Sequence, residues 1–224
     1  LLLQDVNPDT LRAVHRSLWW IHALTAFAFI GYLGFGKLAH IVYGLLGSFF
    51  RDLAPSGRLT HPDIEAALET DPDSLDSLGV DKIEQLSWKN LLDLDSCTNC
   101  GRCEAVCPAH GSGVPLSPRK LIRDMKRHLA ASATGLLGAG TSGNTGDAGA
   151  PAVGPLLGER GGEGSPAAVG EDELWGCRTC GACQRECPVY IEHVPKIVDM
   201  RRYLVMTEAK MSEEVQQFLK NLDD

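Results

Sequence analysis

The sequence lacks a surplus of basic residues: its 224 residues include 21 Lys and Arg against 29 Asp and Glu, a formal net charge of −8. Nucleic acid is therefore not an expected partner, because no excess of positive charge is there to neutralise phosphates. The sequence also lacks the polar–apolar alternation of strands, which predicts an all-α fold. Its 44% of hydrophobic residues exclude a wholly disordered chain.

A secretory signal and an initiator methionine are also missing, since the chain opens Leu1-Leu2-Leu3-Gln4. We therefore expect a piece of a longer polypeptide. Acidic residues gather in residues 52–96, which hold 11 Asp and Glu against 3 Lys and Arg, or −8. This segment is predicted to be an acidic helical connector, with a helix that starts at Thr60.

One long stretch, residues 18–36, lacks charged side chains altogether. It matches the roughly 20 apolar residues that span a bilayer, and the apolar character continues to Phe50 with Lys37 as its only charge. Tryptophans at one edge and Arg51 at the other suit the two membrane interfaces. Residues 1–51 therefore predict a spanning helix; the alternative is a buried helix of a soluble protein.

The eight cysteines form two identical runs with the spacing C-x2-C-x2-C-x3-C-P. This spacing is typical of ligands to two [4Fe–4S] clusters, in which the fourth cysteine of each run serves the other cluster. Gly101 and Gly181 stand where a backbone passes close to sulfide, and their N–H groups are candidate donors to cluster sulfur. The predicted ligands are Cys97, Cys100, Cys103 and Cys187 for one cluster, and Cys177, Cys180, Cys183 and Cys107 for the other.

Disulfides and structural zinc account less well for the cysteines. A disulfide framework needs an oxidising compartment and gives no reason for two identical runs. Structural zinc uses CxxC pairs but does not require the x3-Cys-Pro ending.

The surroundings of the cysteines favour an α-helical ferredoxin domain over a short β-type ferredoxin. Helices are predicted to start at Ser117-Pro118 and at Pro195, and 69 residues separate the two runs. The domain would comprise residues 97–130 and 173–224, with a last helix at 212–222.

Residues 131–172 form an insert between these two parts. Residues 131–170 hold 12 of the 24 glycines and no aromatic residue. Such a composition buries too little apolar surface to offset its ordering entropy, so we expect a flexible loop. Deletion of residues 135–168 is then expected to leave both clusters intact.

Two histidines of the apolar stretch, His22 and His40, are 18 residues apart. On one continuous helix they would share a face and lie about 27 Å apart along the axis, close to the ~30 Å hydrocarbon thickness. They could bind two b haems, with second ligands from other membrane helices. The alternatives are two histidines satisfied within a helix bundle, and His15 as a rival ligand.

Residues 19–50, with HALTAFAFIGYLGFGKLAH at their centre, resemble the last helix of the respiratory nitrate reductase gamma subunit family. That family is a cytochrome b whose last helix carries two haem-ligating histidines at this separation, so the resemblance implies that His22 and His40 are haem ligands. This chain has Gly34 and Gly36 where the family helix typically has Pro and Ser. The fold implied is the C-terminal part of a membrane cytochrome b-like helical domain.

The cysteine segments resemble heterodisulfide-reductase-related iron–sulfur proteins, through LSWKNLLDLDSCTNCGRCEAVCPA, PLSPRKLIRD and WGCRTCGACQRECPVYIEHVPKIVDMRR. Fused members of that family place a gamma-like membrane domain before the clusters, and some are regarded as electron-transfer-flavoprotein:quinone oxidoreductases. No Cys-Cys-Gly stretch of the kind that follows the clusters in that family occurs here, so the substrate-converting part is not in this chain.

The expected function is electron transfer between a cytoplasmic redox partner, for which a flavoprotein is one candidate, and membrane quinone. Iron–sulfur sites are normally kept in reducing cytoplasm, so residues 51–224 are expected on that side of the cell membrane. The alternatives are a membrane-tethered dicluster ferredoxin without haem and a zinc-stapled structural module.

Overall fold

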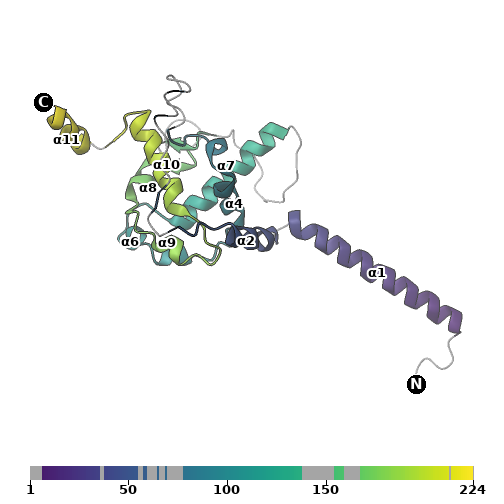
Figure 1. Ribbon diagram of the computed structural model, residues 1–224. Coiled ribbons are helices and arrows are strands. Elements are labelled where there is room, and N and C mark those ends of the chain that lie inside the picture. Colours follow the sequence, from purple (N-terminus) through teal and green to yellow (C-terminus); the bar gives the residue numbers. More distant parts are fainter. Residues whose placement is uncertain are drawn as a thin grey trace.

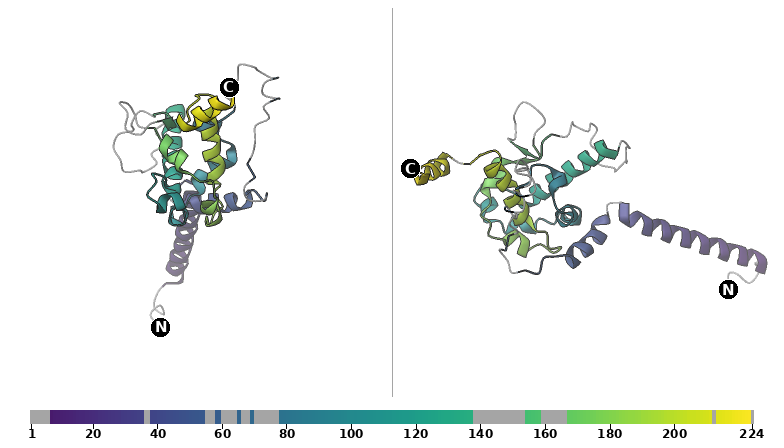
Figure 2. Two further views of the ribbon diagram at one scale, coloured as in Figure 1. Left: turned by 90° about the vertical axis from the view of Figure 1, so that its left-hand side faces the viewer. Right: turned by 45° about the horizontal axis from the view of Figure 1, so that its top comes forward.

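The computed structural model describes residues 7–35, 38–54, 58–59, 65, 69, 78–137, 154–158, 167–211 and 213–223. A helical body formed mainly by residues 78–206 carries all eight cysteines (Figure 1). Helix α1 (Pro8–Phe35) leads away from this body, and α11 (Glu213–Asp223) lies at its other end. The two further views show the same arrangement (Figure 2).

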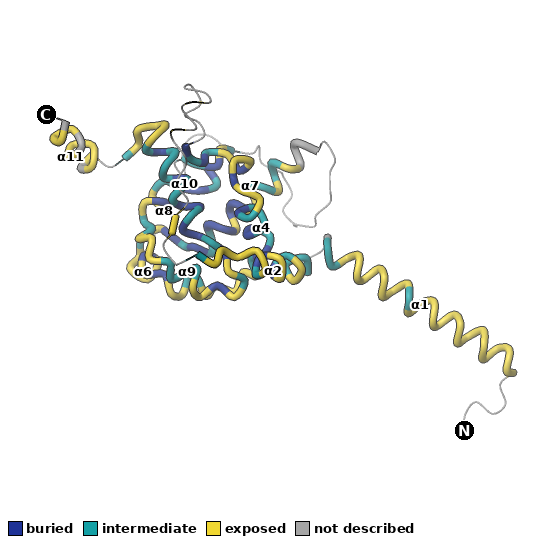
Figure 3. Tube along the Cα trace, viewed as in Figure 1, coloured by how far each residue is buried: buried dark blue, intermediate teal, exposed yellow. Residues whose placement is uncertain are grey.

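The apolar N-terminal segment forms two helices, so the prediction of one continuous helix is wrong. Helix α1 ends at Phe35 and α2 (Ala39–Phe49) begins four residues later. Gly34 and Gly36 stand at this point of the sequence, where glycine weakens a helix, and α2 packs against α4 (Trp88–Ser96). Within the described residues, α1 is long and apolar enough over Pro8–Gly34 to cross a membrane, and its surface is exposed (Figure 3).

The core of the body lies between α7 (Pro118–Leu137) and α10 (His193–Met206). Both helices bury the predicted apolar faces at helical spacing. Ser117 caps α7, since its Oγ accepts a hydrogen bond from Lys120 N at 3.1 Å. Helix α10 begins at His193, two residues before the predicted start. The fully buried apolar side chains of these two helices are Leu121, Ile122 and Met125 of α7, and Ile197, Met200 and Leu204 of α10.

Shorter elements connect these helices around the cysteines. They are the 3-10 turn η2 (Ile83–Gln85), α5 (Arg102–Ala105), α6 (Pro108–Gly111), α8 (Glu171–Gly176) and α9 (Ala182–Arg185). The predicted C-terminal helix is confirmed as α11. The predicted helix start at Thr60, and Lys37, lie outside the described residues.

The ends of the insert are ordered parts of the fold, which corrects the expectation of a loop over residues 131–172. Helix α7 continues to Leu137, and β1 (Leu157–Gly158) pairs in parallel with β2 (Val169–Gly170). Leu156 is 2% exposed and Val169 is 0% exposed, both within the main core. The average composition of residues 131–170 is rich in glycine, so it gave no sign of the few apolar residues that join the core near the ends of the insert. A deletion of 135–168 would therefore remove core side chains and is no longer expected to be harmless.

Leu156 provides a test of this correction. Leu156→Ala is expected to lower the free energy of unfolding by about 2–5 kcal/mol, because it leaves a cavity in the core. Phe218→Ala on the exposed surface of α11 is the control and should change it by less than about 0.5 kcal/mol. Thermal unfolding of the iron-loaded protein under anaerobic conditions measures both, and equal stabilities for the two variants would contradict the packing of Leu156.

Candidate iron–sulfur centres

The two cysteine runs have the same backbone conformation. In each run, the second residue after the first cysteine and the glycine after the second cysteine are left-handed: Asn99 and Gly101 have φ 55° and 82°, and Thr179 and Gly181 have φ 53° and 72°. Each glycine precedes a short helix, α5 or α9, that carries the third cysteine. The glycines are therefore required by backbone conformation in addition to any approach to sulfide.

Alanine at either glycine should strain this turn. Gly101→Ala and Gly181→Ala are each expected to cost about 1–2 kcal/mol in the free energy of unfolding, the penalty of a left-handed non-glycine residue. Gly111→Ala is the matched control, because Gly111 is helical and a Cβ there would meet nothing within 4 Å. That change should be neutral or slightly stabilising, as measured by thermal unfolding; a loss at Gly111 equal to that at Gly101 would contradict the conformational argument.

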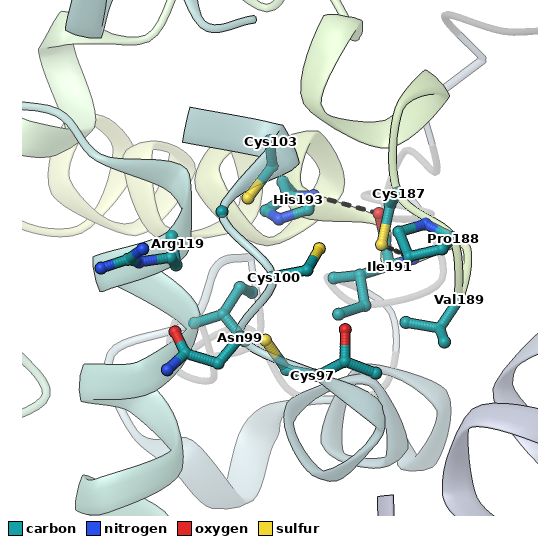
Figure 4. A pocket seen from close by; sticks show the side chains of 13 residues that line it. Cys97, Asn99, Cys100, Cys103, Arg119, Cys187, Pro188, Val189, Ile191 and His193 are labelled. Carbon is teal, nitrogen blue, oxygen red and sulfur yellow. Dashed lines mark hydrogen bonds between the residues drawn. The ribbon is translucent and has the colours of Figure 1, made fainter. Parts of the chain in front are cut away.

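A first cavity lies where the first run meets the end of the second. Cys97 caps the C-terminus of α4, Cys103 lies on α5, and Cys187 follows α9. Figure 4 shows these side chains with Cys100 around the same cavity, and Val189 and His193 beside them. The structure thus brings together Cys97, Cys100, Cys103 and Cys187.

A second cavity has the reciprocal lining. It is surrounded by Cys107, at the start of α6, and by the first three cysteines of the second run, Cys177, Cys180 and Cys183. Helices α5 and α9, which carry Cys103 and Cys183, contact each other. The two cavities are therefore neighbours, and each takes three cysteines from one run and one from the other.

The cysteines of each cavity act on one another electrostatically. Burial, and then the neighbours Cys97 and Cys187, raises the pKa of the Cys103 thiol to about 12. Burial, and then Cys177 among its neighbours, raises the pKa of the Cys183 thiol to about 12. Thiolates crowded in this way repel, so both cavities suit a positively charged metal core.

The arrangement of donors favours a cluster over a single ion. All eight cysteines are described, and none forms a disulfide. Among the described residues, no three His, Cys, Asp or Glu side chains converge on one metal-ion position. Zinc would need its ligands within about 2.0–2.3 Å of one point. Four cysteines around one cavity, three from one run and one from the other, are instead the ligand set typical of a [4Fe–4S] cluster.

Backbone N–H groups point at two of the sulfurs. Thr179 N donates to Cys177 Sγ at 3.4 Å, and Ile191 N donates to Cys187 Sγ at 3.3 Å. Such donors stabilise the thiolate form of a ligand. The predicted donors, the N–H groups of Gly101 and Gly181, stay a prediction.

A buried ionic network supports the loop after Cys187, and sequence reasoning missed it. Asp93 and Lys196 are both 0% exposed, and Lys196 Nζ lies 2.6 Å from Asp93 Oδ2. The same carboxylate accepts a hydrogen bond from Glu192 N at 3.1 Å. His193 Nδ1 contacts Ile191 O at 3.1 Å, and burial lowers the pKa of His193 to about 4. The only signal of this network in the sequence was Lys196, a charged residue on the otherwise apolar buried face of α10.

The predicted haem ligands are on different helices. His22 is exposed on α1, and His40 is half-buried on α2. His15 is also exposed on α1. The single-helix geometry that gave a 27 Å separation is therefore absent from the described structure.

Comparison with protein families finds a match to the 4Fe-4S dicluster domain over residues 96–191. This range contains every cysteine of both runs. Comparison with solved structures finds no match.

Three relatives extend this result. The EtfAB:quinone oxidoreductase of Syntrophomonas wolfei is 42% identical over 98% of this chain and 30% of its own length. A probable membrane-anchored ferredoxin of Chromohalobacter salexigens is 42% identical over 65% of this chain and 21% of its own. One component of the ferredoxin/F420H2-dependent CoB-CoM heterodisulfide reductase of Methanosarcina acetivorans is 28% identical over 51% of this chain and 48% of its own.

The chain spans less than half of the length of each of these relatives. The domain match and the relatives' names agree with the resemblance expected from the cysteine segments. The chain is an iron–sulfur protein related to heterodisulfide reductase, of the kind that transfers electrons through iron–sulfur clusters.

Proposed function

We propose that this chain is the electron-transfer part of a membrane-bound oxidoreductase and connects a cytoplasmic redox partner with membrane quinone. The observation that carries the proposal is the pair of neighbouring four-cysteine cavities in a body joined to an apolar helix. The Syntrophomonas wolfei relative is named for EtfAB and quinone, which supports quinone as one partner.

Cluster ligation is proposed to be crossed. Cys97, Cys100, Cys103 and Cys187 would hold one [4Fe–4S] cluster, and Cys177, Cys180, Cys183 and Cys107 the other. The lining of the two cavities supports this division. When bound, such clusters supply one-electron redox chemistry at a potential set by their surroundings. The protein supplies the thiolates, the N–H donors of Thr179 and Ile191, and a largely apolar enclosure.

Placement relative to the membrane belongs to the same proposal. Helix α1 would span the bilayer as part of a cytochrome b-like domain, with residues 51–224 on the cytoplasmic side. Its 28 residues give a length of about 42 Å, which exceeds the roughly 30 Å hydrocarbon core.

The binding of haem b by His22 and His40 is also proposed, but electron transfer through the clusters does not depend on it. The break between α1 and α2 favours a second candidate, a membrane-tethered dicluster ferredoxin without haem. The membrane-anchored ferredoxin among the relatives agrees with it. A pyridine haemochrome assay on the intact protein distinguishes the two, because only the first contains haem b.

Anaerobic reoxidation tests the function itself. The iron-loaded protein in phospholipid vesicles is reduced with dithionite, excess reductant is removed, and a quinone is added. Reoxidation should follow quinone addition, as monitored by visible absorbance. A variant with both Cys107 and Cys187 changed to Ser is the control. Reoxidation by quinone no faster than in its absence would contradict the quinone connection.

A further inference from the structure

Helix α2 presents its small residues to the protein. Gly44 and Gly47 are buried, and a Cβ on Gly47 would lie 2.9 Å from Ser96 Oγ. A Cβ on Gly44 would lie 3.1 Å from Val189 Cγ1. Ser96 Oγ also donates a hydrogen bond to Tyr43 O at 2.7 Å. The α2 backbone is therefore held directly against α4 and the loop that follows Cys187.

The opposite face of α2 carries large apolar side chains. Leu45 is 71% exposed and Phe49 is 79% exposed, and no residue of α2 is acidic, lysine or arginine. A helix at a water-facing surface shows the reverse pattern, with polar residues outside. The exposed residues of this face are Ile41, Val42, Leu45, Leu46 and Phe49.

The apolar face continues past the end of the helix. Phe50 packs edge-on against Trp88, with ring centroids 5.1 Å apart, and Leu53 is 79% exposed. Arg51 lies over the ring of Tyr190 at 4.5 Å. Aromatic rings and a cation at the margin of an apolar surface are typical of the zone between lipid tails and water.

We infer that this face of α2, together with Phe50, Leu53 and Trp88, lies in the surface layer of a lipid bilayer. The inference rests on the proposed role of α1 as a spanning helix, from which α2 is separated by three residues. The 11 residues of α2 cover about 16 Å, too short for a span of about 30 Å. The interfacial position explains an apolar outer face on a helix whose inner face is already packed.

This position has a consequence for the cysteines. Val189, which α2 contacts through Gly44, also lines the cavity of Cys97 and Cys187 (Figure 4). The first cavity therefore lies on the side of the body that faces the lipid, and the lipid contact fixes its height above the bilayer.

Lipid photolabelling tests the inference. The intact, iron-loaded protein is reconstituted in vesicles of phosphatidylcholine and phosphatidylglycerol that contain a diazirine-bearing phospholipid. Labelled residues are mapped by mass spectrometry after illumination. Labelling over residues 41–53 should exceed that of α11 roughly tenfold. Helix α11 is a matched control because it also exposes apolar side chains, Val215, Phe218 and Leu222, but lies at the other end of the body.

Helix α1 serves as the internal reference. If α1 is labelled and α2 is not, the inference is overturned and the proposed membrane anchoring stays intact. A cross-link of α2 to protein in place of lipid would have the same meaning. Absence of label from both α1 and α2 would overturn the inference and the proposed anchoring together. Equal labelling of α2 and α11 would overturn the inference. Leu45→Asn combined with Phe49→Asn should retain the iron, because both side chains are exposed, and should lose most of the α2 label; retained label would contradict the assignment.

Discussion

Cys107→Ser is expected to damage the cluster bound mainly by the second cysteine run and to leave the cluster of its own run in place. Cys107 lines the cavity of Cys177, Cys180 and Cys183, although it follows Cys103 by only four residues. A serine oxygen is a poor replacement for a thiolate on iron. The variant should lose roughly half of the protein-bound iron, since one of two equivalent clusters is affected.

Cys187→Ser is the matched control for this experiment, because it has the same chemistry at the equivalent position of the other run. It should spare the second-run cluster and damage the one at Cys97, Cys100 and Cys103. Low-temperature electron paramagnetic resonance of the two reduced variants should show two different remaining signals. Damage in each variant to the cluster of its own run would refute crossed ligation.

Asp93→Asn is expected to lower the free energy of unfolding by about 3–5 kcal/mol, because it leaves the charge of Lys196 buried without a carboxylate. Burial already lowers the pKa of Lys196, and Asp93 is the main group that opposes this shift. For a domain of this size the loss corresponds to a fall of roughly 6–20 °C in Tm. Thermal unfolding of the iron-loaded protein measures it.

Asp95→Asn, two residues along the same helix, is the control. Its carboxylate is paired with Lys126 at 3.2 Å, but both side chains are more than 40% exposed, and such pairs contribute about 0–1 kcal/mol. Asp93→Leu combined with Lys196→Met should recover much of the stability, because the fully buried ammonium is removed together with its carboxylate. Lys89, which also pairs with Asp93, keeps Glu192 as a partner at 3.6 Å. Equal effects of the Asp93 and Asp95 changes would contradict a structural role for the buried pair.

The parts of the fold that depend on local spacing could be predicted from the sequence. The buried faces of α7 and α10 followed from helical periodicity, as Met125 and Met200 illustrate. The identical cysteine runs predicted two equivalent loops, and the same left-handed turns occur in both.

The parts that depend on distant contacts could not be predicted. Asp93 and Lys196 are 103 residues apart, and the sequence around each of them does not indicate its partner. The break between α1 and α2 reflects docking of Gly47 on Ser96, which a hydrophobic run cannot reveal. Leu156 joins the core from within a glycine-rich segment whose average composition predicts a loop.

The central claim is that two [4Fe–4S] clusters occupy the two cysteine cavities, and its most direct test is the joint determination of iron and acid-labile sulfide in protein purified without oxygen. The account predicts about eight iron atoms and about eight sulfides per chain, four of each per cluster. Two zinc ions without sulfide, or protein that binds no iron, would contradict it.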